Sequence, residues 1–382
     1  MGMSEDAGRL AAALPLGTML GPGEPLPWFA ATTATNPSYM VDTVAGRYVV
    51  LSFPGALDSD RGRTFRNFMF GAAQSHFDTV NAIFLGVVTD PADVAAGLAM
   101  DRAPAMRWFQ DFDQKLSRHL GVDGSAATLH TLVLDPALRV VARIRMEYPE
   151  AHNAALEKVL RALPPIEGEQ WASGTAPVLI VPRILELDLC RRLIAAYDAH
   201  GGEDSGFMTA RGGRSVGVHD HSRKRRSDYS IEDQDLCRML AGRITRRLVP
   251  MIQRATQFRA TRIERYIVAC YEAERQGFFA PHRDNTTPAT RHRKFAVTMN
   301  LNAEEYDGGD LRFPEFGHRT YRAPTGGAVV FSCSMLHEAL PVTRGRRYAF
   351  LPFLYDDAAA EVRERTRSLI DSPGERKPDQ PA

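Results

Sequence analysis

The stretch that decides the fold of the C-terminal half reads Tyr266-Ile-Val-Ala-Cys-Tyr-Glu-Ala-Glu-Arg-Gln-Gly-Phe-Phe-Ala-Pro-His-Arg-Asp284. His282 and Asp284 are two residues apart in a strand-like segment, and side chains at that spacing lie on the same side of an extended backbone. His337 follows a later strand-like run. Two histidines and one carboxylate suit Fe(II) and leave coordination positions open. The sequence therefore predicts that these three side chains bind one metal ion.

A candidate anchor for a second ligand follows in the segment His337-Glu-Ala-Leu-Pro-Val-Thr-Arg-Gly-Arg-Arg347. A guanidinium can bind a carboxylate through two parallel hydrogen bonds, a geometry that lysine cannot reproduce. Arg346 competes with Arg347 for this role, but neighbouring residues in a strand point to opposite faces. Only one of the two can face the predicted metal, and the other faces solvent.

With these motifs, residues 177–356 resemble the 2-oxoglutarate- and Fe(II)-dependent dioxygenases of the prolyl 4-hydroxylase type. The order of that family is present: a tyrosine-containing strand, HxD, a Gly-Gly hairpin, a distal histidine and then an arginine. The resemblance implies an α+β domain, a double-stranded β-helix or jelly roll with supporting helices. The regularly spaced short strands from Arg262 onward favour the same architecture.

The resemblance also implies the site and its cofactors. Fe(II) would be held by His282, Asp284 and His337, the catalytic set, and 2-oxoglutarate by Arg347, the arginine that matches the family pattern. O2 would be the other co-substrate, with ascorbate as an optional reductant. Two further contacts to 2-oxoglutarate are expected from Tyr271 and Thr298, for which barrel packing and strand propensity are the alternative explanations.

The implied reaction is hydroxylation of a C–H bond with release of succinate and CO2. The resemblance favours a peptidyl proline or another protein side chain as substrate. A free amino acid or a natural-product intermediate stays open, as do a thiol-redox protein and a binding protein that has kept the barrel without catalysis.

Length and composition limit the class of protein. A chain of 382 residues favours two domains. The hydrophobic fraction of 44%, with 24% charged residues, is typical of globular proteins, and the net charge of +1 gives no field that would attract nucleic acid. No signal sequence or membrane-spanning run is evident. Four scattered cysteines without a CxxC motif fit a reducing compartment, so we expect a cytoplasmic protein.

Residues 1–163 are expected to form the first domain. Buried strand-like runs, 48–53 and 82–89, alternate with helical patterns, which is typical of a layered α/β fold. The entry segment Gly21-Pro-Gly-Glu-Pro-Leu-Pro-Trp-Phe29 and the phrase Gly86-Val-Val-Thr-Asp90 resemble the thioredoxin-like peroxiredoxins. That family needs a reactive cysteine after the first core strand. Here this stretch reads Pro54-Gly-Ala-Leu-Asp-Ser-Asp-Arg61, so we expect a redox-inactive domain that docks a partner or presents a substrate.

The remaining boundaries follow from composition. Residues 164–176 gather Pro, Gly and Ser, which favours a linker, with a packed surface loop as the alternative. The dioxygenase domain is expected over 177–358. Residues 359–382 are interpreted as a polar C-terminal tail, disordered from about Ser372.

A basic segment, residues 211–226, carries the histidine pair His219 and His221. We interpret it as a mobile loop that covers the site, with a solvated loop, nucleic-acid contact and a second metal site as alternatives. Asn285 and residues 291–294 follow the HxD motif, and either line the substrate entrance or form a polar loop.

Overall fold

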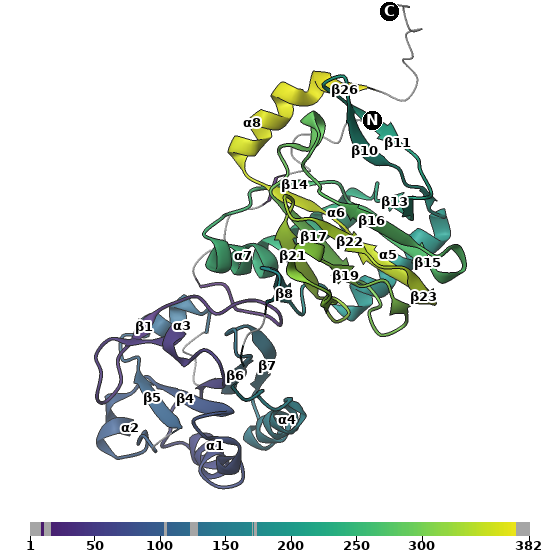
Figure 1. The fold of residues 1–382 in the computed structure, drawn as a ribbon. Coiled ribbons are helices and arrows are strands. Elements are labelled where there is room, and N and C mark those ends of the chain that lie inside the picture. Colours follow the sequence, from purple (N-terminus) through teal and green to yellow (C-terminus); the bar gives the residue numbers. More distant parts are fainter. Residues whose placement is uncertain are drawn as a thin grey trace, which may run out of the picture. The chain divides into compact units, whose positions relative to one another are not determined.

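The computed structural model describes residues 9–10, 17–102, 105–122, 129–169, 171 and 174–371. It divides into two compact units, Leu14–Gln170 and a second made of Met1–Ala13 with Trp171–Ala382 (Figure 1). Arg9 and Leu10 therefore group with the C-terminal unit instead of the predicted first domain, because Arg9 bridges to Arg262 and Leu10 lies in the core of that unit. Three parts of the sequence for which predictions were made lie outside the described residues. They are the N-terminal segment that was searched for a signal sequence, part of the predicted linker, and the C-terminal end that was predicted to be disordered.

The unit Leu14–Gln170 is built on a five-stranded sheet in the order β5-β4-β3-β6-β7. Its strands are β3 (Tyr48–Phe53), β4 (Ala82–Val88), β5 (Met106–Gln110), β6 (Leu129–Leu134) and β7 (Val140–Met146), and its helices are α1 (Asp60–Met69), α2 (Pro91–Ala95), α3 (Lys115–His119) and α4 (Pro149–Ala162). β3, β4 and β5 run parallel, whereas β6 and β7 pair antiparallel. A short ribbon of β1 (Ala30–Ala31) and β2 (Tyr39–Met40) lies before this sheet.

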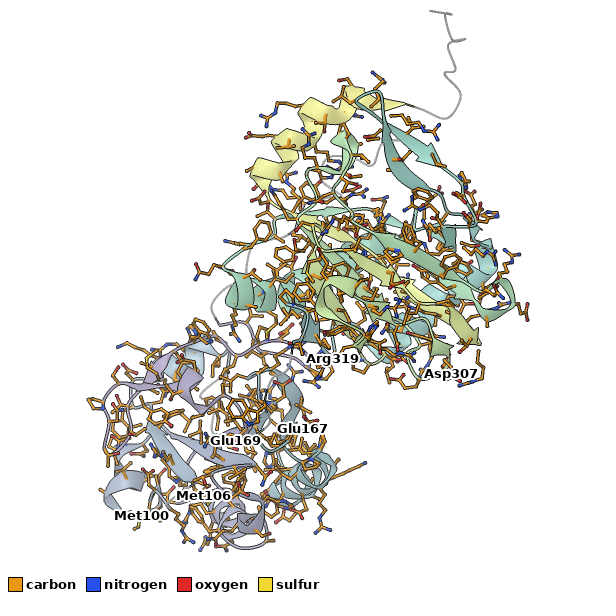
Figure 2. All side chains as sticks on the ribbon, viewed as in Figure 1. Met100, Met106, Glu167, Glu169, Asp307 and Arg319 are labelled. Atoms are coloured by element: carbon orange, nitrogen blue, oxygen red, sulfur yellow. The ribbon has the colours of Figure 1, made fainter. Side chains whose placement is uncertain are left out.

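Both faces of this sheet are buried, as the continuous apolar runs predict. Alternate residues of β3 enter different cores: Val49 and Leu51 pack on one side, and Val50 packs with α1 and α4 on the other. Met106, which begins β5, is 3% exposed, whereas Met100, between α2 and β5, is 62% exposed (Figure 2). The unit is therefore a layered α/β fold.

The C-terminal unit is dominated by two sheets. The larger contains β9 (Glu203–Asp204), β13 (Ser227–Ser230), β14 (Arg262–Glu264), β15 (Ile267–Glu272), β17 (Phe295–Asn300), β24 (Arg346–Phe350) and β25 (Phe353–Tyr355), joined through β17 by β21 (Ala328–Ser332) and β8 (Leu179–Val181). The smaller has the order β12 (Lys224–Arg225), β16 (Phe278–His282), β22 (His337–Ala339), β19 (Leu311–Arg312) and β20 (Thr320–Tyr321). A further pair, β18 (Asp307–Gly308) and β23 (Val342–Arg344), forms a small ribbon.

Strand alternation divides the core of this unit in two. On β15, Val268 and Cys270 pack with the helices, whereas Ile267, Ala269 and Tyr271 face a second cluster that includes residues of the smaller sheet. The helices on the outer face are α5 (Leu187–His200), α6 (Gln234–Arg243) and α7 (Val249–Thr256), with the π-helical segment Ile244–Leu248 joining the last two. The predicted jelly-roll type of architecture, two sheets with supporting helices, agrees with this arrangement.

Two sequence interpretations were wrong. Residues 359–371 are not a tail: α8 (Asp357–Thr366) begins with the Asp356 side chain accepting a hydrogen bond from the amide of Ala359, which is buried, and β26 (Ile370–Asp371) pairs with β11. Nor is 211–226 simply a loop. β10 (Phe207–Arg211) and β11 (Arg214–Val218) form a hairpin whose two glycines have positive φ, and Lys224 and Arg225 form β12.

Candidate active site

The three predicted metal ligands meet at the edge of one strand pair. β16 pairs antiparallel with β22, and His282 and His337 are directly opposite each other in that pairing. Asp284 follows β16 by two residues, and its amide donates to the carbonyl of Cys333. The main-chain ladder therefore brings together side chains that are far apart in the sequence.

An irregularity in β16 gives His282 its direction. His282 is three positions after Phe279, but their partners His337 and Ala339 are only two positions apart. In a regular strand, residues three apart point to opposite faces, and an extra residue restores the same face. The rings of Phe279 and His282 are accordingly stacked, with centroids 3.5 Å apart. Pro281, which has no N–H to donate, lies at this interruption of the ladder.

The ligand atoms of the triad converge. His282 Nε2 lies 3.6 Å from Asp284 Oδ1, and His337 Nε2 lies 3.3 Å from Asp284 Oδ2. The candidate ligand atoms of the three residues lie within 4.8 Å of one another. Among the residues that the structure describes, this is the one group of three or more His, Cys, Asp or Glu side chains with such spacing.

The hydrogen bonds of the two rings leave the correct nitrogen free. His282 Nδ1 is 2.8 Å from the carbonyl of Ala280, and His337 Nδ1 is 3.0 Å from the carbonyl of Met335. A carbonyl only accepts, so each Nδ1 carries the proton and each Nε2 keeps a lone pair directed to Asp284. This is the usual outer support of a metal-bound histidine.

Burial and neighbouring charge favour the metal-binding protonation states. Burial, with the nearby His337, lowers the pKa of His282 to about 3, so its ring is neutral at physiological pH. Burial raises the pKa of Asp284, but electrostatic interactions with the neighbouring His337, His282 and Arg293 outweigh this effect, and the net pKa is lowered. A neutral imidazole and an ionised carboxylate are the forms that coordinate a cation.

The triad opens onto a cavity of about 460 Å³ that is also lined by Tyr271, Thr298 and Arg347. Tyr271 and Arg347 are opposite each other in the β15–β24 pairing, and the Arg347 guanidinium lies 4.9 Å from the centre of the Tyr271 ring. Thr298 is buried on the central strand β17. All of the predicted site residues therefore border one space.

Arg347 is prepared for an anion. It is 2% exposed, and its Nε and Nη1 atoms have no hydrogen-bond partner. Arg346 points outward, where it pairs with Glu272 and is 54% exposed. Unpaired buried donors cost free energy unless a ligand satisfies them. A carboxylate of 2-oxoglutarate fits these donors, and the His-Asp-His set fits Fe(II).

Several cavity residues were not singled out by their chemistry in the sequence. Lys224 and Arg226 lie on the same side of the chain and enter the cavity from the segment interpreted as a mobile loop. Arg265, the residue immediately before Tyr266, also lines the cavity. Within 291–294 only Arg293 lines the cavity, and Asn285 does not. In the sequence these residues are visible only as basic residues next to predicted strands. The sequence alone does not distinguish basic residues that line a cavity from those on the surface.

The predicted histidine pair lies apart from the triad. His219 and His221 are both exposed and both lie 2.9 Å from one oxygen of Asp204. They do not form part of a three-residue metal group among the described residues. The hairpin before them contributes Phe207 to Ala210 to the cavity wall.

Residues 266–355 match the family profile described as the 2OG-Fe(II) oxygenase superfamily. A PKHD-type hydroxylase of Synechococcus sp. (strain JA-2-3B'a(2-13)) is 32% identical over 121 residues, which cover 30% of this chain and 48% of that protein. The chain thus spans about half the length of this curated relative. The multifunctional procollagen lysine hydroxylase and glycosyltransferase LH3 of Rattus norvegicus is 26% identical over 197 residues, which cover 50% of this chain and 25% of that protein.

Among solved structures, a Pseudomonas putida prolyl-4-hydroxylase aligns with 22% identity and a TM-score of 0.34, covering 48% of this chain and 94% of that one. Residues 266–355 of the C-terminal unit are thus similar to the 2OG-Fe(II) oxygenase superfamily, and part of the chain is similar to PKHD-type hydroxylases. Its sequence match includes all three metal-site residues and Arg347.

Proposed function

We propose that the C-terminal unit is an Fe(II)- and 2-oxoglutarate-dependent dioxygenase that hydroxylates a C–H bond. The observation that carries the proposal is the convergence of His282, Asp284 and His337 beside a buried arginine with unpaired donors, inside the segment that matches the oxygenase superfamily. In this role the three ligands hold Fe(II), and Arg347 holds the distal carboxylate of 2-oxoglutarate, with Tyr271 and Thr298 as further contacts.

Bound iron and 2-oxoglutarate would supply the oxidation: one atom of O2 enters the substrate C–H bond and the other enters succinate, with loss of CO2. The protein positions and shields the reactants. The Nδ1–H bonds of both histidines fix their rings; Phe279 stacks on the His282 ring, and Phe331 packs at a tilt against the His337 ring. These contacts limit water around the open coordination positions.

For the substrate, we propose a prolyl or other side chain of a protein, the class acted on by the named hydroxylases that this chain resembles. A free amino acid is the second candidate. Thiol redox chemistry is disfavoured because all four cysteines are buried, and burial raises the pKa of Cys190 and Cys270 to about 12.

We further propose a thioredoxin-like fold without redox activity for residues 14–170, which would dock a partner or present the substrate. The succession of parallel β3 and β4, antiparallel β6 and β7, and a final helix α4 supports this proposal. No helix among the described residues has both the length and the apolar character needed to cross a bilayer.

The test is absorption spectroscopy of the purified chain under anaerobic conditions. Adding Fe(II) and then 2-oxoglutarate should produce a metal-to-ligand charge-transfer band. Admitting oxygen should release succinate, slowly without substrate and faster with it. A protein that binds Fe(II) yet shows neither the band nor succinate would instead be a binding protein on an oxygenase fold.

A further inference from the structure

The cavity carries more positive charge than the proposed reaction needs. Of the described residues that line it, one is acidic, Asp284, and seven are basic: Arg223, Lys224, Arg226, Arg265, Arg283, Arg293 and Arg347. Three of the seven are neutralised by carboxylates: Arg226 by Asp228, Arg283 by Glu315 and Arg293 by Glu264. The others have no ion pair with a carboxylate.

Iron and co-substrate would account for Arg347 alone. Fe(II) and Arg347 together bring three positive charges, and Asp284 with the two carboxylates of 2-oxoglutarate brings three negative charges. The loaded centre is therefore neutral. Arg223 is exposed at the rim, but Arg265 lies inside the wall, and neither the metal nor the co-substrate balances its charge.

Arg265 is held toward the cavity in an unusual way. Its Nε donates to the carbonyl of Leu351 at 3.0 Å, and its guanidinium lies 4.2 Å from the centre of the Phe353 ring. Its φ is +56°, a conformation that is uncommon for a residue with a long side chain and that often marks a functional position. Burial and nearby arginines lower its pKa only to about 10, so it stays charged at neutral pH.

Lys224 provides a second basic group. It is 4% exposed, and its Nζ donates to Ser205 Oγ at 2.8 Å and to the carbonyl of Gly206 at 2.6 Å. Burial, with the nearby Arg226, lowers the pKa of Lys224 to about 6, so this amine is largely neutral at physiological pH as long as no anion lies beside it. The Nζ atom lies 4.9 Å from the centre of the Phe279 ring, which in turn stacks on His282. Lys224 is thus one aromatic ring away from the metal ligands.

We propose that the substrate of this site carries a carboxylate, which the Arg265 guanidinium binds, with Lys224 as a polar neighbour. The proposal rests on the dioxygenase function above and narrows its substrate class. A planar guanidinium and a carboxylate form charge-assisted hydrogen bonds, which are stronger in a partly desolvated cavity. The aromatic ring of Phe353, against which Arg265 and Arg293 both lie, would support the apolar part of the same substrate.

The carboxylate can come from three sources, and matched pairs of probes distinguish them. L-proline against L-prolinamide tests a free amino acid. A proline-containing peptide with Glu or Gln beside the proline tests an acidic side chain. The same Gln peptide with a free or an amidated C-terminus tests a chain end. Each probe is added to the anaerobic Fe(II)–2-oxoglutarate complex to measure its dissociation constant from the change in the charge-transfer band, and then to the aerobic enzyme to measure succinate release.

In at least one pair the acid should bind about tenfold to a hundredfold more tightly than its amide, the range for a charge-assisted hydrogen bond. Arg265→Gln should reduce this ratio to near one, and Arg265→Lys should keep part of it. Arg259→Gln, which removes an exposed arginine outside the cavity, should leave the ratio unchanged. Thermal melting of each variant shows whether it is folded.

The two proposals can fail separately. If the charge-transfer band does not form in the wild-type protein, the dioxygenase function fails. If the band forms but no acid binds more tightly than its amide in any pair, the carboxylate proposal is overturned. The wild-type comparison decides this even if Arg265→Gln does not fold.

Discussion

Both units bury histidines, but they use the ring nitrogens differently. In the N-terminal unit, His152 places Nε2 2.9 Å from the Thr131 hydroxyl and Nδ1 3.3 Å from Asn153 Oδ1, so both nitrogens have protein partners. In the C-terminal unit, His282 and His337 each use one nitrogen on a backbone carbonyl and direct the other to Asp284 beside a cavity. A second nitrogen that has no donor partner and faces a cavity, rather than burial alone, distinguishes a candidate ligand from a core residue.

Buried arginines show the same contrast. Arg139 is 1% exposed, and its Nε and Nη2 atoms donate to the carbonyl of Gly23. Arg347 is equally buried but keeps two nitrogens without a partner. A satisfied buried cation stabilises a fold, whereas an unsatisfied one facing a cavity indicates a ligand.

The largest difference between the two units is expected when one buried histidine is removed from each. His337→Ala should abolish the charge-transfer band and succinate release, because the metal loses one of its three ligands. His152→Ala should leave both signals and lower the free energy of unfolding by about 1–3 kcal/mol, since it removes a buried hydrogen bond to Thr131, whose hydroxyl then keeps only its contact with Ser52. A band of normal intensity in His337→Ala would remove this residue from the metal site.

A second test uses pH and a third kind of buried histidine. His130 is 3% exposed, its Nε2 has no hydrogen-bond partner, and it does not line the cavity beside the triad. Burial, with Arg143 and Arg145, lowers its pKa from 6.5 to about 4. Below pH 6.5 the His130 ring becomes protonated in the unfolded chain but stays neutral in the folded chain. The contribution of the neutral His130 ring to the free energy of unfolding is therefore complete above pH 6.5, and about 3 kcal/mol of this free energy is lost when the pH falls to 4.

Urea unfolding between pH 4 and 7 measures this loss. His130→Gln has no titrating ring, so the acid limb of its stability profile should be flatter than that of the wild type. Parallel profiles would show that other groups cause the acid sensitivity.

Removing one buried arginine from each unit should give a smaller effect. Arg347→Gln should raise the KM for 2-oxoglutarate about tenfold to a hundredfold, because the charge-assisted bonds to its distal carboxylate are lost. Arg139→Gln should leave this KM unchanged while lowering the melting temperature. Steady-state succinate release over a range of 2-oxoglutarate concentrations measures the first effect, and an unchanged KM in Arg347→Gln would contradict the assignment.

The smallest effect is expected from the neighbour of the anchor. Arg346→Ala removes an exposed ion pair with Glu272, so the free energy of unfolding should change by less than about 1 kcal/mol. The KM for 2-oxoglutarate should stay at the wild-type value. A large change in that KM would mean that the two arginines have exchanged faces.

Much of the site could be predicted because it depends on the local geometry of single strands. The two-residue spacing of His282 and Asp284, and the opposite faces of Arg346 and Arg347, follow from strand geometry. His282 and His337 lie close together because their strands pair. In the sequence, only the order of motifs shared with a known family indicated this pairing. The extra residue in β16 gives no clear sequence signal, because Pro281 is also compatible with a turn.

The misinterpretations have physical causes. Residues 357–366 contain good helix formers after the capping residue Asp356, but so few apolar residues that they resembled a tail. Lys224 and Arg265 looked like surface charges, since single basic residues are usually solvated. Which basic side chains a fold buries is a tertiary property that local pattern does not contain.

The direct pairing of His282 with His337 has a consequence for how such a protein can change. Because the β16–β22 ladder fixes the spacing of the two imidazoles, loops of the intervening chain that lie outside Asp284 and the core strands β17 and β21 can change in length without altering that spacing. That chain includes Arg293 and Phe313, which lie beside the cavity or pack near His337. Grafting new loops between the two strands is therefore a direct route to altering selectivity while the iron chemistry is retained.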